Sequence, residues 1–313
     1  MSPPVSREFA LYHLDGCGAP LPSARAEPFS AALYSRYKYG SLAATEWFGS
    51  RLATAFTIRH AWLAHQPRLL LAPSPHGRVP TAAAALTRAF QTSLNTARDQ
   101  RGLPPAPTVQ IERTIATSGD YGTLSTEERR ALMAGNGLSF ERFRPHGVDG
   151  AHLLVVDDVR VTGAHQNCLT RASAALPFAS RTFVYIAAFP ADAPEGVDPR
   201  AEDALNHAAV TTVDDLAGIA RSPGFAWNVR VCKFLLGAAN RERLTPFLAT
   251  MPTAFVHALH HHSLADGYAT MPAYRDSHRM VQDELRRRPA HRQPQPPQPP
   301  RGGIADAIVR AAP

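Results

Sequence analysis

A short apolar run that ends in two adjacent acidic residues constrains this 313-residue chain more than any other feature. The segment His152–Gln166 reads HLLVVDDVRVTGAHQ, and Asp157 and Asp158 follow its apolar part directly. An apolar run such as Ala151–Val156, bounded by turn signals, is typical of a central strand in a parallel sheet. A helix and another strand are expected next, over Gln166–Leu176 and Thr182–Ala188. This alternation predicts an α/β fold with right-handed crossovers.

The end of the expected strand has the chemistry of a sugar-phosphate site. Ligands of open α/β sheets bind at the carboxyl ends of the strands. Carboxylates accept hydrogen bonds from hydroxyls, so Asp157 and Asp158 suit a ribose. A phosphate would meet backbone N–H groups where the next helix starts, and Gly163 permits its close approach. The residues of this turn are Val161, Thr162, Gly163, Ala164 and His165.

The segment resembles the signature of type I phosphoribosyltransferases, an apolar strand followed by Asp-Asp and a Thr-Gly turn. The resemblance implies a Rossmann-like, parallel-sheet fold that binds 5-phosphoribosyl-1-pyrophosphate (PRPP). Asp157 and Asp158 would hold the ribose 2′- and 3′-hydroxyls, and the turn would hold the 5′-phosphate. Val161 and His165 stand where the family usually has small hydroxyl residues, so two helpful side-chain hydroxyls are missing. An acidic strand end in another Rossmann-like protein is the alternative.

A loop after an earlier expected strand, Arg68–Ala72, is the second element of the resemblance. Pro80 is expected to open an alanine-rich helix behind this loop. In the family, a loop at this place binds the pyrophosphate of PRPP, and Arg78 would be its charged contact. The alternative is an ordinary turn with an exposed arginine. The residues that would take the pyrophosphate role are Ser74, Pro75, His76, Gly77 and Arg78.

The segment Ile111–Met133 resembles the flexible loop of the ComF-like branch of the family. It follows a further candidate strand, Thr108–Glu112, and includes a short expected helix, Ser125–Met133. In the family this loop closes over PRPP and shields the reaction from water, which is physically reasonable for a reactive ribosyl centre. A surface loop with a solvated helix is the alternative. The residues carried over are Arg113 and Arg129, with Asp120 and Tyr121 as further members.

A helical pattern over residues 31–65 contains the segment Tyr34–Gly40, YSRYKYG. This segment resembles the ComF-like N-terminal region, which has a Lys-Tyr pair on a helix. Lys38 could contact phosphate, or it could extend from an amphipathic helix with its charge in water. The resemblance covers about residues 31–190. It reaches furthest toward a ComF-like subgroup associated with tellurium-resistance-type gene clusters, although this chain has no N-terminal cysteine cluster for zinc.

Four regions are expected along the chain. Residues 1–30 form an irregular N-terminal lead or a hood over the site, and residues 31–195 form the phosphoribosyltransferase core. Residues 196–285 carry amphipathic stretches without convincing strands, which predicts a helical C-terminal domain or cap. Residues 286–313 are rich in Pro, Gln and Arg and form a flexible tail.

Charge and cysteine content indicate the partners and the compartment. The net charge is +7, and Lys38 and Lys233 are the only lysines, so nearly all of the positive charge is arginine. Arginine binds phosphate bidentately, which suits an anionic partner. The apolar runs are too short to cross a membrane, and the N-terminus lacks the pattern of a secretory signal. Three widely spaced cysteines suggest the reducing cytoplasm.

The resemblance implies an enzyme of nucleotide metabolism that transfers the phosphoribosyl group of PRPP to a nitrogenous acceptor, a nucleobase or an amine, and releases pyrophosphate. Mg²⁺ is the implied cofactor, held by the substrate with weak or indirect help from Asp157 and Asp158. Arg78, Arg113 and Arg129 would stabilise developing negative charge. The first alternative is a non-catalytic, PRPP-sensing regulator that binds nucleic acid. The others are a nucleotide pyrophosphorylase or nucleoside-processing enzyme, and an adaptor. Family members often dimerise, so a homodimer is also left open.

Overall fold

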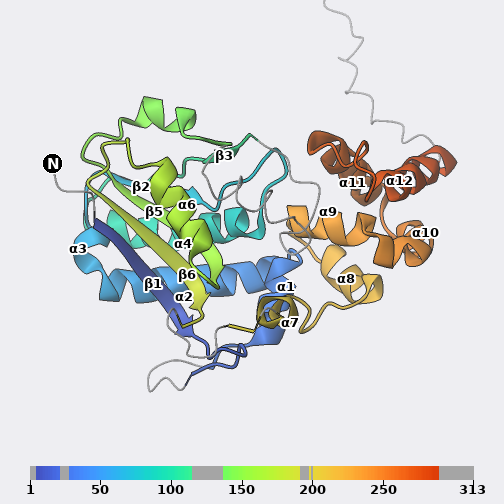
Figure 1. Cartoon of the computed structure of the whole chain (residues 1–313), viewed down its shortest axis with the longest axis horizontal. Coiled ribbons are helices and arrows are strands. Elements are labelled where there is room, and N and C mark those ends of the chain that lie inside the picture. The colour runs from blue at the N-terminus through green and yellow to red at the C-terminus, as the bar shows by residue number, and fades with distance from the viewer. Residues whose placement is uncertain (1–4, 22–27, 115–136, 191–196, 199, 289–313) are drawn as a thin grey trace, which may run out of the picture.

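Four parallel strands form the sheet that organises the larger part of the molecule (Figure 1). The computed structural model describes residues 5–21, 28–114, 137–190, 197–198 and 200–288. The strand order is β1-β6-β5-β2. The bounds of these strands are Val5–His13 for β1, Leu69–Pro73 for β2, His152–Arg160 for β5 and Ser180–Ala188 for β6. The parallel arrangement confirms the expected α/β fold.

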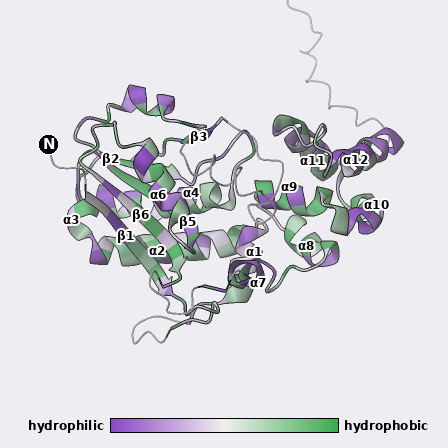
Figure 2. Ribbon diagram, in the orientation of Figure 1, coloured by the Kyte–Doolittle hydropathy of each residue, from purple (hydrophilic) through white to green (hydrophobic). Residues whose placement is uncertain are grey.

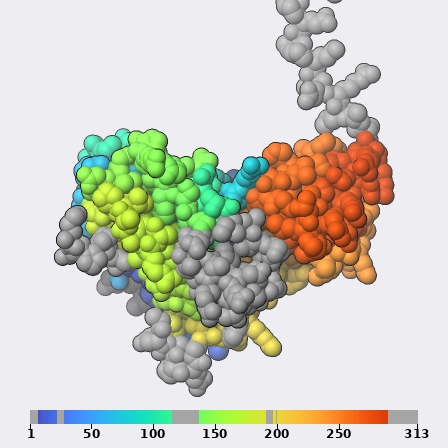
Figure 3. Space-filling view, turned by 45° about the horizontal axis from the view of Figure 1, so that its top comes forward, coloured from blue at the N-terminus to red at the C-terminus, as the bar shows by residue number. Residues whose placement is uncertain are grey.

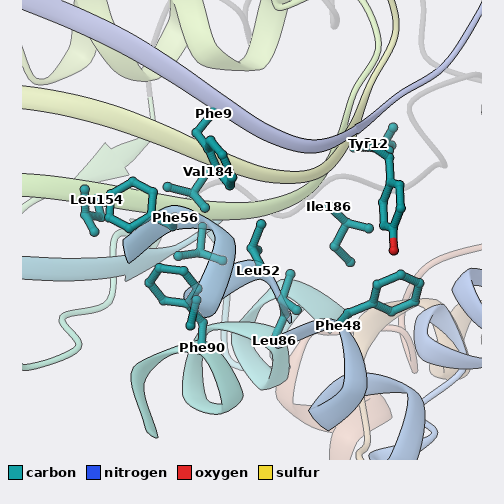
Figure 4. Close-up of a cluster of buried hydrophobic side chains, with 14 of the residues drawn as sticks. Phe9, Tyr12, Phe48, Leu52, Phe56, Leu86, Phe90, Leu154, Val184 and Ile186 are labelled. Carbon is teal, nitrogen blue, oxygen red and sulfur yellow. The ribbon is translucent and has the colours of Figure 1, made fainter. Parts of the chain in front are cut away.

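Alternation along β5 divides the apolar side chains between two faces of the sheet. Leu154 and Val156 join the cluster formed with α2 (Leu42–Arg59) and α4 (Ala82–Asp99) (Figure 4). Leu153 and Val155 join the cluster on the opposite face, which includes side chains from α6 (Ala164–Ala172) and the 3-10 helix η2 (Glu141–His146). Both faces are therefore covered, as the continuous apolar run of β5 requires.

Smaller elements surround the sheet. The helices α1 and α3 flank α2, and the two-stranded antiparallel sheet β3-β4 lies apart from the main one. Their bounds are Ala31–Lys38 for α1, Ala61–Ala64 for α3, Glu112–Arg113 for β3 and Leu138–Ser139 for β4.

Helices are the only regular secondary structure in the described part of the chain beyond residue 200. Most of them pack around a second apolar cluster, which includes Leu235, Leu248 and Leu259. Figure 3 shows this helical region as an orange body beside the sheet, and Figure 2 shows the contrast between the hydrophobic central strands and the hydrophilic α12. The bounds are Ala201–Asn206 for α7, Val213–Ala220 for α8, Val229–Leu236 for α9, Ala238–Asn240 for η3, Arg241–Thr250 for α10, Thr253–Ala265 for α11 and Arg275–Arg287 for α12.

The helical C-terminal region expected from the sequence is confirmed as secondary structure. The buried residues of α7, Ala201 and Leu205, belong to the sheet's cluster, whereas Val210 and the helices beyond it belong to the second one. The two cores therefore divide near residue 210, and the predicted boundary near residue 196 stays a prediction. None of the described helices is long and apolar enough to span a bilayer.

The expectation of an irregular lead over residues 1–30 is wrong for Val5–His13. This segment pairs in parallel with β6 and forms the edge strand β1. Exposed Arg7 and Glu8 interrupt its apolar pattern. Exposed charged residues of this kind are common in edge strands. Its buried side chains, Phe9 and Tyr12, face the cluster with α2.

Two other expected elements differ in form. The helix over residues 31–65 is three helices, because Gly40 adopts a φ of +86° after α1 and His60 ends α2. The candidate strand Thr108–Glu112 is represented only by isolated bridges to β2 and to His76, and by the start of β3. The expected helix Ser125–Met133 and residues 289–313 of the tail lie outside the described residues.

Candidate functional site

The acidic pair lies inside β5, at the carboxyl edge of the sheet. Asp157 and Asp158 each keep only 14% of their side-chain surface exposed. The strand continues to Arg160, whose guanidinium pairs with Glu8 at 2.7 Å, so the two carboxylates are held in regular strand geometry. This is the edge at which open α/β sheets bind their ligands.

Lys38 forms a buried ion pair with Asp158. Its side chain is 9% exposed and reaches the carboxylate from the last turn of α1. The structure therefore brings Lys38 to the acidic pair, and its ammonium does not extend into water. A charge buried to this degree needs a partner, and Lys38 and Asp158 provide one for each other.

Asp157 has a different environment from its neighbour. Burial raises the pKa of its carboxyl to about 7, and the negative charge of Asp158 adds to the effect. Lys38 and a hydrogen bond from Ser74 lower the pKa in the opposite direction. Asp157 can therefore hold a proton near neutral pH.

His165 connects the acidic pair to the loop after β2. Its Nε2 lies 3.1 Å from Ser74 Oγ and 3.9 Å from Asp157 Oδ2. Desolvation, and secondly Arg113, lower the pKa of His165 to about 4, although 36% of the side-chain surface is exposed. The imidazole is therefore neutral at neutral pH, and its contact with Asp157 is polar rather than ionic.

The turn Val161–His165 leads from β5 into α6, as the sequence predicts. Gly163 is the N-cap of α6 with a φ of +73°, a conformation that favours glycine. Thr162 Oγ1 accepts a hydrogen bond from the N–H of Ala164 at 3.4 Å. The positive end of the nine-residue helix α6 thus lies directly after the acidic pair.

The loop Ser74–Arg78 connects β2 to the segment before α4. The N–H of Ser74 donates to the carbonyl of Val156 on β5 at 3.1 Å, so the loop starts beside the acidic pair. His76 Nδ1 lies 3.0 Å from the carbonyl of Gly77, and the side chain of Arg78 is exposed. The loop's last backbone donors contact Asp266 of the helical region.

Arg113 on β3 lies near the same site. Its N–H donates to the carbonyl of His76 at 3.0 Å, which ties β3 to the loop Ser74–Arg78. Desolvation lowers the pKa of its guanidinium, and Asp157 and Cys168 are close enough to oppose the shift. The other residues predicted for the flexible loop, Asp120, Tyr121 and Arg129, lie outside the described residues.

Sequence reasoning missed two tyrosines and one aspartate at this site. The hydroxyls of Tyr34 and Tyr37 on α1 are buried and have no hydrogen-bond partner in the described part of the chain. Burial, and then Asp158, raise the pKa of both phenols. The spacing of Tyr34 and Lys38, one helical turn apart, is the signal that could have found this face. No local signal marks Asp266.

The donors present suit Mg²⁺ only in part. Oxygen ligands are those that Mg²⁺ prefers, and Asp157 and Asp158 supply carboxylates. Asp158 is already paired with Lys38, and the described residues contain no group of three or more acidic, His or Cys side chains that could hold a metal. The site therefore fits an ion held mainly by oxygens of its substrate.

A covered parallel sheet with an acidic pair at its carboxyl edge defines an open α/β protein, a class whose members bind ligands at that edge. The chain belongs to the ComF-like phosphoribosyltransferase family, described as PRTase ComF-like, whose model matches residues 5–281. No curated protein matches the chain.

Two solved structures illustrate the more distant similarity. Hypoxanthine-guanine phosphoribosyl transferase of L. donovani is 17% identical, with 51% of this chain and 79% of that chain covered and a TM-score of 0.32. Hypoxanthine phosphoribosyl transferase of Trypanosoma cruzi is 16% identical, with 55% and 82% covered and a TM-score of 0.32.

Proposed function

We propose that this chain is a PRPP-dependent phosphoribosyltransferase that transfers the phosphoribosyl group to a nitrogenous acceptor, a nucleobase or an amine. The observation that supports the proposal most directly is the environment of the acidic pair. Asp157 and Asp158 are largely buried, lie at the sheet's carboxyl edge and adjoin both a helix N-terminus and the loop Ser74–Arg78. This arrangement provides hydroxyl acceptors between two anion-binding segments, as a ribose with phosphates at both ends requires.

Each part of PRPP has its own group of residues in this proposal. The ribose hydroxyls donate to Asp157 and Asp158, and the ion pair with Lys38 holds the Asp158 carboxylate in place for that role. The 5′-phosphate accepts hydrogen bonds from the turn Val161–His165 at the start of α6. The pyrophosphate meets the loop Ser74–Arg78, where Arg78 can swing toward it because its side chain is exposed.

Mg²⁺ would neutralise the leaving pyrophosphate when it is bound. The chain's residues position the substrate around that ion. The acceptor nitrogen forms a bond to the anomeric carbon as the carbon–oxygen bond to pyrophosphate breaks, and the electron pair of the broken bond leaves with pyrophosphate. The acceptor nitrogen then loses a proton to solvent. Arg113, and in the proposal Arg129, stabilise the negative charge that develops.

The acceptor is the least constrained part of the proposal. The helical region is the candidate hood, because it contacts both α1 and the segment before α4. The amide of Asn228 donates to the carbonyl of Lys38 at 3.2 Å, and the N–H of Val229 donates to the carbonyl of Pro80 at 2.9 Å. A base bound above the ribose would thus meet residues of this region.

A turnover assay tests the proposal. Purified protein is incubated with PRPP and Mg²⁺, and pyrophosphate release is measured across a panel of nucleobases and amines. We expect release that depends on one class of acceptor and that falls by about 100-fold or more in Asp157→Asn/Asp158→Asn. Asp214→Asn/Asp276→Asn is the matched control, because it removes two exposed carboxylates far from the sheet.

The same assay separates the second candidate function, a non-catalytic PRPP-sensing regulator that binds nucleic acid. The net charge of +7 favours a polyanionic partner for such a protein. PRPP binding without pyrophosphate release for any acceptor, together with salt-dependent binding of nucleic acid, would support the regulator and reject the enzyme.

A further inference from the structure

The carboxylate of Asp266 occupies backbone donors of the loop Ser74–Arg78. Its Oδ1 accepts hydrogen bonds from the N–H groups of Arg78 and of the next residue, Val79, each at 3.0 Å. Asp266 belongs to the helical region and follows α11 directly. Consecutive backbone N–H groups that converge on one oxygen are the arrangement with which proteins bind phosphate oxygens. An aspartate thus stands where an anionic ligand would bind.

The carboxylate lies unusually close to the loop. A Cβ atom added to Gly77 would be 3.2 Å from Asp266 Oδ1, and the three nearest atoms to it would all belong to Asp266. The backbone at Gly77 is not in the left-handed region, so glycine is not required there for its conformation. Its missing side chain instead leaves room for the carboxylate. The close fit therefore involves residues from both parts of the molecule.

The donors that Asp266 occupies lie shortly before α4. Val79 lies two residues before Thr81, the N-cap of this 18-residue helix. The N-terminus of a helix attracts anions through its dipole and its unpaired N–H groups. An incoming pyrophosphate would compete with Asp266 for the same donors, and if both stayed, their like charges would repel.

The backbone around Asp266 allows the side chain to withdraw. Asp266 is the C-cap of α11, and Gly267 follows it with a φ of +75° and no atoms within 4 Å of an added Cβ. The end of α11 is held by the N–H of Tyr268, which donates to the carbonyl of Ser263 at 2.8 Å. In the proposal, a rotation of the Asp266 side chain releases the two loop donors, and the hydrogen bond of Tyr268 keeps the helix end in place.

Other contacts hold the helical region against the sheet without Asp266. The N–H of Ala226 donates to the carbonyl of Gly40 at 2.9 Å, and Asn228 and Val229 bind the carbonyls of Lys38 and Pro80. Substitution of Asp266 should therefore free the loop without detaching the helical region.

We propose that Asp266 is an internal anion that restrains the pyrophosphate subsite by competing with the ligand's phosphate oxygens for the N–H groups of Arg78 and Val79. This inference rests on the proposed function, because it assigns regulation to the same loop. Binding of PRPP or pyrophosphate displaces Asp266, and a change that draws the helical region's loop away from Gly77 raises the affinity of the site.

Calorimetric titration with magnesium pyrophosphate and with PRPP tests the inference. Asp266→Asn keeps the shape of the side chain and removes its charge. Asp266→Ser removes the charge and also shortens the side chain. We expect both variants to bind pyrophosphate about tenfold more tightly than the unaltered protein, because the charged competitor is lost. Asp276→Asn is the control: it makes the same change in net charge on the exposed face of α12 and should leave the affinity unchanged.

The outcomes that contradict the inference differ in what else they reject. If the unaltered protein binds pyrophosphate or PRPP and the folded Asp266 variants bind no more tightly, the competition is rejected and the proposed function stands. Weaker binding by both variants would show that Asp266 supports the loop instead. If no protein in the series binds either ligand, the proposed function and the inference fail together. Thermal melting of each variant establishes that it is folded.

Discussion

The buried carboxyl of Asp157 carries an energetic cost in the ligand-free fold. The pKa of its carboxyl in the folded chain, about 7, lies above the ordinary value of 3.8. Ionisation therefore costs more in the folded state than in the unfolded one. The cost builds up as the pH rises from about 4 to about 7 and is fully present above that range.

Asp157→Asn should consequently stabilise the ligand-free protein at pH 8. We expect the free energy of unfolding to rise by about 1–2 kcal/mol, less than the full shift implies because part of the side chain reaches water. Urea denaturation at pH 8 and pH 5 measures the effect, which should shrink at the lower pH. A variant less stable than the unaltered protein at pH 8 would contradict this account, and Asp276→Asn controls for the change in net charge.

The ion pair between Lys38 and Asp158 also affects the stability of the fold. Lys38→Met leaves the Asp158 carboxylate buried without its cation, and we expect a loss of about 2–4 kcal/mol in unfolding free energy. Adding Asp158→Asn should restore much of this loss, since no uncompensated charge then remains. The two single variants and the double variant form a thermodynamic cycle. Additive losses would mean that the two side chains do not stabilise each other.

At the scale of elements, the site depends on the turn between β5 and α6. Gly163 adopts a φ of +73° where α6 starts, and Gly163→Ala would strain this conformation by about 1–2 kcal/mol. We expect PRPP affinity to fall about tenfold as the helix start shifts. Gly102→Ala is the matched control, because Gly102 has a φ of +66° with open space around it and is not part of the site. Equal PRPP affinities for the two variants would contradict a role for this turn.

The elements near the acidic pair could be predicted because their signals are local. The apolar run of β5, the adjacent Asp157 and Asp158, and the glycine of the next turn all lie within one short segment. The edge strand β1 could not, because exposed residues such as Arg7 interrupt its pattern and its pairing with β6 joins distant segments. The contacts of Lys38 with Asp158 and of Asp266 with Arg78 depend on tertiary packing, so no local pattern marks them.

At the scale of the whole molecule, the sheet part and the helical region are in direct contact just after α1. Gly40 ends the segment that carries Lys38, and an added Cβ there would lie 2.4 Å from the carbonyl oxygen of Ala226 in the helical region. The sheet part and the helical region are therefore packed together next to the segment that positions Lys38. This contact makes the helical region part of the site's support.

Gly40→Ala should destabilise the protein by about 3 kcal/mol or more, because it combines a left-handed backbone with a collision between main-chain segments. Gly102→Ala measures the cost of the left-handed backbone alone, and we expect it to lower the free energy of unfolding by only about 1–2 kcal/mol. Urea denaturation of both variants measures the difference. Equal losses would mean that the contact between Gly40 and Ala226 is loose.

The central claim is that the acidic pair of β5 binds the ribose of PRPP. Calorimetric titration of PRPP with Mg²⁺ into the unaltered protein, Asp157→Asn/Asp158→Asn and the control Asp214→Asn/Asp276→Asn tests it most directly. The account predicts saturable binding to the unaltered and control proteins and a loss of affinity of about 100-fold or more in the first variant. Absence of binding to the unaltered protein, or equal binding to all three, would contradict it.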